Sequence, residues 1–233
     1  MSADEDSVRG WSRLHGEDVS GNRVAVGWIR LVHLLARPVA RVPPDVLSAA
    51  GVLSTAGAVV TASRWPWVAL VLVVLGGVLD GVDGAVALRA GRARPLGAVV
   101  DAVADRLSDV GLAAVLVALG GDFRWAAAIV VAMFLHEYAR ARAQGVGMSS
   151  AGAITVAERP TRVVIVAVAC LGAAVFPTAT PWTRWPWATV CLALWSLCAL
   201  VGGAQLVAGI RRALAGRSRP GSGMADEPGD DLR

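Results

Sequence analysis

The stretch Asp80-Gly-Val-Asp83-Gly84-Ala-Val-Ala87, continued by Gly97-Ala-Val-Val-Asp101-Ala-Val-Ala-Asp105, places four aspartates in otherwise apolar sequence. An ionised aspartate at the centre of a membrane helix costs roughly 2.5–3.5 kcal/mol, so four would cost about 10 kcal/mol if nothing compensated them. Carboxylate oxygens are hard ligands suited to Mg²⁺, Mn²⁺ or Ca²⁺. The stretch therefore predicts a divalent-cation site in a helical membrane protein.

The composition of the whole chain points to the same class of protein. Its 233 residues are 55% hydrophobic and 17% charged, whereas a soluble domain carries about a quarter charged residues. Apolar runs of membrane-spanning length recur along the chain. We therefore expect an all-α polytopic membrane protein with six transmembrane helices, at about residues 46–62, 66–88, 96–120, 125–142, 163–183 and 185–210.

The segments outside these spans have a different character. Residues 1–20 and 213–233 are polar and rich in small residues, so we expect disordered tails there. Residues 21–42 interleave bulky apolar side chains with arginines, which predicts an amphipathic helix lying at the membrane interface. A short helix packed on the protein surface is the alternative for that segment. Residues 43–212 would form a single transmembrane domain.

Arginine placement predicts the orientation of the chain. The links at residues 89–94 and 140–162 are basic, and so is the exit of the last span at Arg211 and Arg212. The positive-inside rule then puts both termini and the aspartates on the cytoplasmic side of the plasma membrane. The net charge of +4 suggests anionic headgroups or phosphates as partners. Nucleic acid is not expected, because no basic stripe with interleaved aromatic residues is present.

The spacing of the aspartates predicts a shared site. Asp80 and Asp83 are three residues apart and Asp101 and Asp105 are four apart, so each pair shares one helix face. Two antiparallel helices joined near residues 90–95 would bring the pairs together. Two divalent ions held there could clamp a phosphoryl group, leaving one carboxylate to accept a proton. A cation or proton transporter is the alternative of another class. For Asp109 we expect only an ion pair with a neighbouring arginine such as Arg106.

The aspartate stretch resembles the signature of the CDP-alcohol phosphatidyltransferase family, D-x2-D-G-x2-A-R-x8-G-x3-D-x3-D, and the resemblance covers roughly residues 40–212. It implies a phosphotransferase of phospholipid biosynthesis that moves a phosphatidyl group from CDP-diacylglycerol to an alcohol and releases CMP. By this resemblance Asp80, Asp83 and Asp101 would bind the Mg²⁺ or Mn²⁺ ions, and Asp105 would be the general base. The resemblance also implies a homodimer.

One position departs from that signature. Leu88 stands where the family has an arginine that helps to hold the donor phosphates. Arg92, one helical turn further on, could reach the same region if the helix continues. The donor nucleotide would then be bound around Gly84, Ala87, Arg92 and Gly97. An inactive paralogue is a further alternative that this departure raises.

A second motif bears on the acceptor. The sequence Tyr138-Ala-Arg140-Ala-Arg142-Ala-Gln144, with Glu158-Arg159-Pro-Thr-Arg162, resembles the Y-x-K-A-R-A-E…E-R-x-x-R pattern of actinobacterial phosphatidylinositol phosphate synthases. By this resemblance Arg140, Arg159 and Arg162 would bind the phosphate of a phosphorylated polyol, inositol phosphate being favoured. Guanidinium groups suit bidentate phosphate binding. Glycerol 3-phosphate would fit the same basic pocket and is the alternative acceptor.

Overall fold

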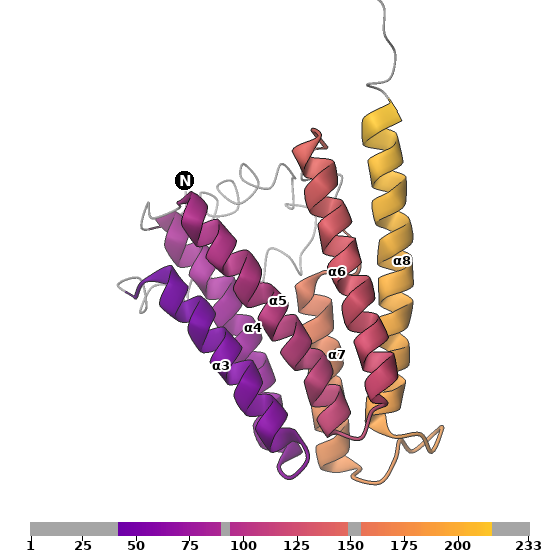
Figure 1. Ribbon diagram of the computed structural model, residues 1–233. Coiled ribbons are helices and arrows are strands. Elements are labelled where there is room, and N and C mark those ends of the chain that lie inside the picture. Colours follow the sequence, from indigo (N-terminus) through magenta and orange to yellow (C-terminus); the bar gives the residue numbers. More distant parts are fainter. Residues whose placement is uncertain (1–41, 90–93, 149–154, 216–233) are drawn as a thin grey trace, which may run out of the picture.

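The computed structural model describes residues 42–89, 94–148 and 155–215, which form six α-helices (Figure 1). They are α3 (Pro44–Ala62), α4 (Pro66–Arg89), α5 (Pro95–Ala118), α6 (Phe123–Gly145), α7 (Arg159–Val175) and α8 (Trp187–Ala215). These described ranges contain no strand, so the all-α prediction is confirmed. α8 runs to Ala215, three residues past the domain limit expected at 212. The tail expected at 1–20, most of the helix expected at 21–42 and residues 216–233 lie outside the described residues.

Proline and a capping aspartate fix where several helices begin. α3 and α5 start with Pro44 and Pro95, and Pro160 lies in the first turn of α7. Proline suits this position because its missing N–H would have no partner inside the helix in any case. At the start of α6 the Asp122 carboxylate accepts a hydrogen bond from the Trp125 backbone N–H at 2.7 Å, which is the usual role of an N-cap residue.

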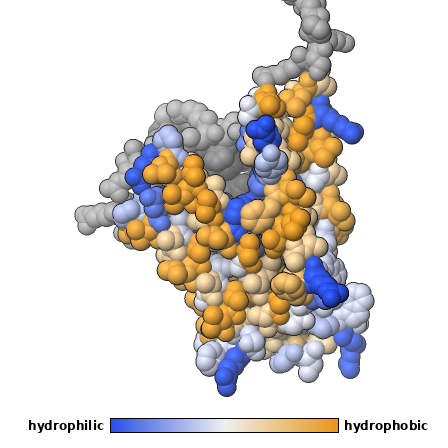
Figure 2. All heavy atoms as spheres, viewed as in Figure 1, coloured by the Kyte–Doolittle hydropathy of each residue, from blue (hydrophilic) through white to orange (hydrophobic). Residues whose placement is uncertain are grey.

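Three of the described helices are long and apolar enough to cross a membrane. They are α3, the part of α4 from Pro66 to Gly84, and α8. The other three helices, expected as spans from the sequence, do not meet the same criterion. α5 and α6 carry several charged residues within their length, and α7 has only 17 residues. Figure 2 shows hydrophobic residues over much of one face of the molecule, with hydrophilic residues mainly toward its two ends.

Small residues allow α3, α4 and α5 to pack closely. A Cβ atom on Gly111 of α5 would lie 2.7 Å from Cγ2 of Thr55 on α3, and one on Gly76 of α4 would lie 3.2 Å from the Gly51 carbonyl oxygen. Close approach of this kind at small residues is typical of membrane helices. α7 packs against α4, α5 and α8, and α6 packs against α5 and α8. This packing holds the aspartate-bearing ends of α4 and α5 beside the start of α7.

Candidate functional site

Three of the four motif aspartates lie together. Asp80 on α4 and Asp101 and Asp105 on α5 each offer a carboxylate oxygen, and these oxygens lie within 4.8 Å of one another. All three side chains are half-buried. The antiparallel packing of α4 and α5 therefore brings the two sequence pairs to one end of the helix bundle, as their spacing predicts.

Asp83 lies apart from this group of three. Its Oδ2 accepts a hydrogen bond from the Ser48 hydroxyl of α3 at 2.5 Å, and its Oδ1 accepts one from the Gly84 N–H at 2.6 Å. The side chain is 3% exposed. The sequence places Asp83 on the same helix face as Asp80, but the packing of α3 supplies a hydroxyl that turns its carboxylate toward Ser48.

Arg159, at the start of α7, lies among the aspartates. Its Nη1 is 2.7 Å from Oδ1 of Asp80 and also contacts Oδ1 of Asp105. The sequence resemblance places this residue at the acceptor phosphate, and the structure places it against the carboxylates of Asp80 and Asp105. The guanidinium supplies part of the charge compensation that the buried carboxylates need.

The carboxylate group fits a divalent ion. Its donor atoms are hard oxygens, which Mg²⁺ and Mn²⁺ prefer. Oδ1 of Asp105 is buried and accepts no hydrogen bond with good geometry among the described residues. An ion and the Arg159 guanidinium would need the same oxygens of Asp80 and Asp105, so Arg159 would have to release them when an ion binds.

Arg162 lies deeper than the sequence predicts. Its Nη1 donates to Oδ2 of Asp109 at 2.6 Å, its Nη2 to Oε1 of Glu137 at 3.0 Å, and its Nε to the Ala157 carbonyl at 3.0 Å. The side chain is 3% exposed and Asp109 is fully buried. The interpretation of Arg162 as a direct phosphate ligand is therefore corrected, because each guanidinium nitrogen already has a partner inside the protein. Asp109 does form the expected ion pairs, but inside the bundle.

Arg140 and Glu158 form a second pair near the site. Nη2 of Arg140 donates to Oε1 of Glu158 at 2.6 Å, and Nη1 donates to Oε2 at 3.3 Å. Oε1 of Glu158 also accepts from the Thr155 backbone N–H at 3.1 Å. Arg140 on α6 is thus brought to the start of α7, within the same region as Arg159.

Glu137 is a residue of this charged region that the sequence did not indicate. It lies 3.2 Å from Nη1 of Arg106, 3.0 Å from Nη2 of Arg162 and 3.6 Å from Nη1 of Arg140. One glutamate on α6 therefore contacts arginines of α5, α6 and α7. The sequence signal is a charged residue directly before the Tyr138 motif, at the end of an apolar run that closes at Leu135.

The residues expected around the donor nucleotide lie near the link between α4 and α5. No described atom lies within 4 Å of a Cβ built on Gly84, whereas one on Gly97 would lie 3.4 Å from Cγ of Arg94. Close packing against the described residues therefore does not account for Gly84. Ala87 belongs to the last turns of α4, and Arg92 lies outside the described residues.

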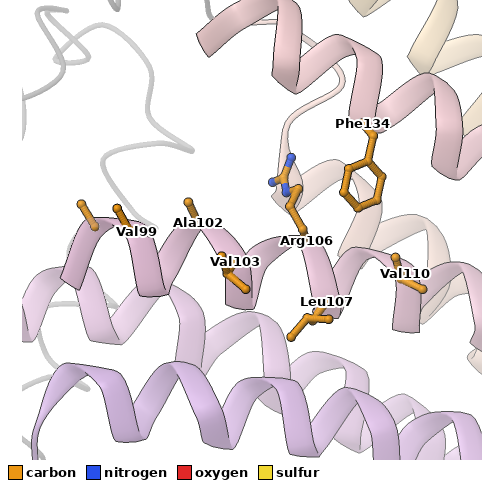
Figure 3. Close-up of a pocket in the computed structure, with 8 residues that line it drawn as sticks. Val99, Ala102, Val103, Arg106, Leu107, Val110 and Phe134 are labelled. Carbon is orange, nitrogen blue, oxygen red and sulfur yellow. The ribbon is translucent and has the colours of Figure 1, made fainter. Parts of the chain in front are cut away.

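An apolar groove of about 530 Å³ runs along α5 and faces Phe134 of α6 (Figure 3). Arg106 is the one charged residue in its lining. The guanidinium of Arg106 lies 3.2 Å from Asp109 and 3.2 Å from Glu137. Arg106 therefore marks the boundary between the apolar groove and the charged interior, and the aspartates of the site do not line the groove.

Comparison with known proteins agrees with this site. The family model described as CDP-alcohol phosphatidyltransferase matches residues 41–203. The chain is 37% identical to archaetidylinositol phosphate synthase of Pyrococcus horikoshii over 105 residues, which is 43% of this chain and 54% of that protein. It is 34% identical to phosphatidylinositol phosphate synthase of Mycolicibacterium smegmatis over 212 residues, or 81% of this chain and 86% of that protein.

Two solved structures of Mycobacterium tuberculosis phosphatidylinositol phosphate synthase have a similar fold at 26% sequence identity. The structure with CDP-DAG bound has a TM-score of 0.62 and covers 83% of this chain and 100% of that one. The structure with manganese and citrate has a TM-score of 0.63 and covers 82% and 96%. Together with the aspartate signature on α4 and α5, these matches show that the chain belongs to the CDP-alcohol phosphatidyltransferase family.

Proposed function

We propose that this membrane protein transfers a phosphatidyl group from CDP-diacylglycerol to the hydroxyl of inositol phosphate and releases CMP. The observation that carries the proposal is the meeting of Asp80, Asp101 and Asp105 with Arg159 at one end of the bundle. Arg140 pairs with Glu158, the residue directly before Arg159. The carboxylates suit the metal-bound phosphates of a donor, and the arginines suit the phosphate of an acceptor. The names of the relatives and the CDP-DAG-bound neighbour support the same pair of substrates.

The carboxylates of α4 and α5 would hold Mg²⁺ or Mn²⁺. When bound, such ions neutralise charge on the phosphoryl group and on the leaving CMP. Asp80, Asp83 and Asp101 are the proposed ligands, and the manganese-bound neighbour supports divalent ions. Asp83 keeps a free lone pair on each oxygen while it accepts from Ser48 and Gly84, so its hydrogen bonds orient it without consuming its capacity to bind an ion.

Asp105 is the proposed general base. It would accept the proton of the acceptor hydroxyl as the oxygen attacks the β-phosphoryl group of the donor. The new bond joins that oxygen to phosphorus while the bond from phosphorus to the CMP oxygen breaks, and Asp105 then returns the proton to solvent. Its carboxylate contacts Arg159, one of the two arginines proposed for the acceptor phosphate, so the base lies beside the acceptor.

Arg140 and Arg159 are the proposed residues for the acceptor phosphate. Both are only partly buried, and they come from different helices that meet at the start of α7. Gly84, Ala87, Arg92 and Gly97 remain the proposed donor side. Glycerol 3-phosphate, which carries the same phosphate, is the second candidate acceptor.

We also propose that all six helices span the plasma membrane, with residues 43–212 as the catalytic domain in a homodimer. The charged residues of α5, α6 and α7 pair with one another inside the bundle, so their helices can present apolar faces to lipid. The arginines between α4 and α5 and beside α7 support a cytoplasmic active site.

The test is CMP release by the purified protein. CDP-diacylglycerol and Mn²⁺ or Mg²⁺ are supplied with inositol phosphate, glycerol 3-phosphate or unphosphorylated inositol. We expect CMP with inositol phosphate, little with inositol, and none after chelation of the metal. Absence of CMP with every acceptor, or metal-dependent cation flux in its place, would refute the proposal. Faster CMP release with glycerol 3-phosphate would assign the second acceptor.

A further inference from the structure

Two arginines of α7 face two aspartates of α5. Arg159 contacts Asp105, and Arg162 contacts Asp109. The arginines are three residues apart and the aspartates four, so each pair is separated by about one helical turn. The two contacts are therefore successive points along the same α5–α7 interface.

The two contacts differ in the number of further residues that their members contact. Asp109 also receives Nη2 of Arg106 at 3.2 Å, and Arg162 also donates to Glu137 of α6. The Asp109–Arg162 contact is thus tied to α5, α6 and α7 at once and is closed to solvent. The contact of Arg159 with Asp105 lies one turn nearer the mouth of the site and is partly open.

A buried ion pair of this kind fixes the relative position of its two helices more than it raises the stability of the protein. Removing two charges from water offsets much of their attraction, so replacing both by apolar groups is often harmless, whereas removing one leaves an uncompensated charge. A slip of α7 by one turn along α5 would take Arg162 away from both Asp109 and Glu137 of α6. The buried pair therefore defines the register in which Arg159 lies beside Asp105.

We propose that Asp109 and Arg162 are positioning residues for the transfer reaction. Neither touches substrate: their pair fixes the first turn of α7 against α5, and this places Arg159 between the general base and the acceptor phosphate. The inference rests on the proposed function, since it assigns Arg159 to the acceptor. It gives Asp109, which lies beyond the four signature aspartates, a defined part in acceptor binding.

The effect on kinetics should be confined to the acceptor. The donor side is built from α4 and the start of α5, and α7 supplies the acceptor side. In Asp109→Asn and Arg162→Gln we expect the KM for inositol phosphate to rise about tenfold and kcat to fall, because small misplacements of a binding group are costly in rate. The KM for CDP-diacylglycerol should change by less than about twofold.

Three further variants sharpen the experiment. Ser108→Ala is the matched control, since it alters the adjacent buried position without removing a charge; both KM values should stay at wild type. In an Arg159→Gln background, Asp109→Asn should raise the acceptor KM no further, because residues that act through one another are not additive. If a single variant fails to fold, Asp109→Leu with Arg162→Met keeps the packing without an unpaired charge and should still raise the acceptor KM.

A Mn²⁺ titration followed by electron paramagnetic resonance gives a readout without turnover. Loosening Arg159 frees the Asp80 oxygen that it contacts, so Asp109→Asn should bind Mn²⁺ more tightly than Ser108→Ala does. Any of three results would overturn the positioning role. They are equal shifts in both KM values, a lower Vmax with both KM values unchanged, and a wild-type acceptor KM in the double variant Asp109→Leu with Arg162→Met. A wild-type enzyme that releases no CMP would refute the proposed function instead, and the Mn²⁺ titration would still decide the role of Asp109.

Discussion

Two ion-paired regions lie one helical turn apart between α5 and α7, and they differ in access. In the outer region Arg159 is 12% exposed and Asp105 is 26% exposed, whereas in the inner region Arg162 is 3% exposed and Asp109 is fully buried. Both regions use the same two residue types. What separates them is exposure. The partly exposed charges of Arg159 and Asp105 can exchange partners, whereas those of Arg162 and Asp109 are buried among three helices and pair with each other.

The largest expected effect is a loss of activity when a residue of the outer region is substituted. Asp105→Asn removes the proposed base but keeps the shape of the side chain, so CMP release should fall by about 10²–10⁴-fold. The rate is measured with saturating CDP-diacylglycerol and inositol phosphate. Asp122→Asn is the matched control: an asparagine still caps α6, and it should keep the wild-type rate. A rate for Asp105→Asn equal to that of the control would remove Asp105 from the chemistry.

The second effect is a loss of stability when a residue of the inner region is substituted. Asp109→Asn leaves the buried Arg162 without its 2.6 Å carboxylate partner, and loss of one member of a buried pair destabilises by about 3–5 kcal/mol. Thermal unfolding in detergent should therefore show a clear loss for Asp109→Asn and a much smaller one for Asp105→Asn. Equal losses for the two variants would show that the regions do not differ in the way their exposure indicates.

A smaller effect tests how Asp83 is held apart from the group of three aspartates. Ser48→Ala removes the hydroxyl that donates to Asp83 at 2.5 Å. Loss of a hydrogen bond to a metal-binding carboxylate lowers metal affinity by about 10–100-fold. Mn²⁺ titration of Ser48→Ala against Ser54→Ala, a matched serine further along α3, measures this. Equal Mn²⁺ affinities would argue that Asp83 does not ligate the ion.

The smallest effect concerns an exposed pair at the same end of the bundle. Arg94 lies 2.6 Å from Asp45, and both side chains are more than a third exposed. Surface pairs contribute about 0–1 kcal/mol, so Arg94→Gln should change the unfolding temperature little and leave CMP release at wild type. A loss comparable to that of Asp109→Asn would mean that burial is not what distinguishes the inner region.

Much of the fold could be predicted because it depends on local pattern. Apolar runs between charged links predict the six helices, and the prolines at Pro44 and Pro95 mark where two of them begin. The ends are less exact, since α7 ends at Val175, eight residues before the expected limit at 183. The spacing predicts that all four aspartates meet, since helical periodicity fixes which residues share a face, and three of them, Asp80, Asp101 and Asp105, do so. Among the described residues only three helices qualify as spans by length and composition, because α5 and α6 carry charged residues within their length and α7 has only 17 residues.

The candidate site was less predictable, because its charged residues pair with residues on helices that lie far away in the sequence. Asp83 turns to Ser48, which lies 35 residues earlier, and Arg162 pairs with Asp109, which lies 53 residues earlier. Periodicity within one helix contains no information about these choices. Glu137 illustrates the limit: it joins three arginines, yet its neighbours along the chain give no sign of this.

The sequence by itself determined the family, the helices and the chemical type of the site, since a fixed spacing of aspartates on two helices is a local property. Only the tertiary structure decided which charges stay partly exposed and which are buried against each other. Arg159 and Arg162 are three residues apart in one motif, and the sequence treats them alike. Packing of α5, α6 and α7 buries one and leaves the other partly open, because burial depends on what the neighbouring helices bring to each position.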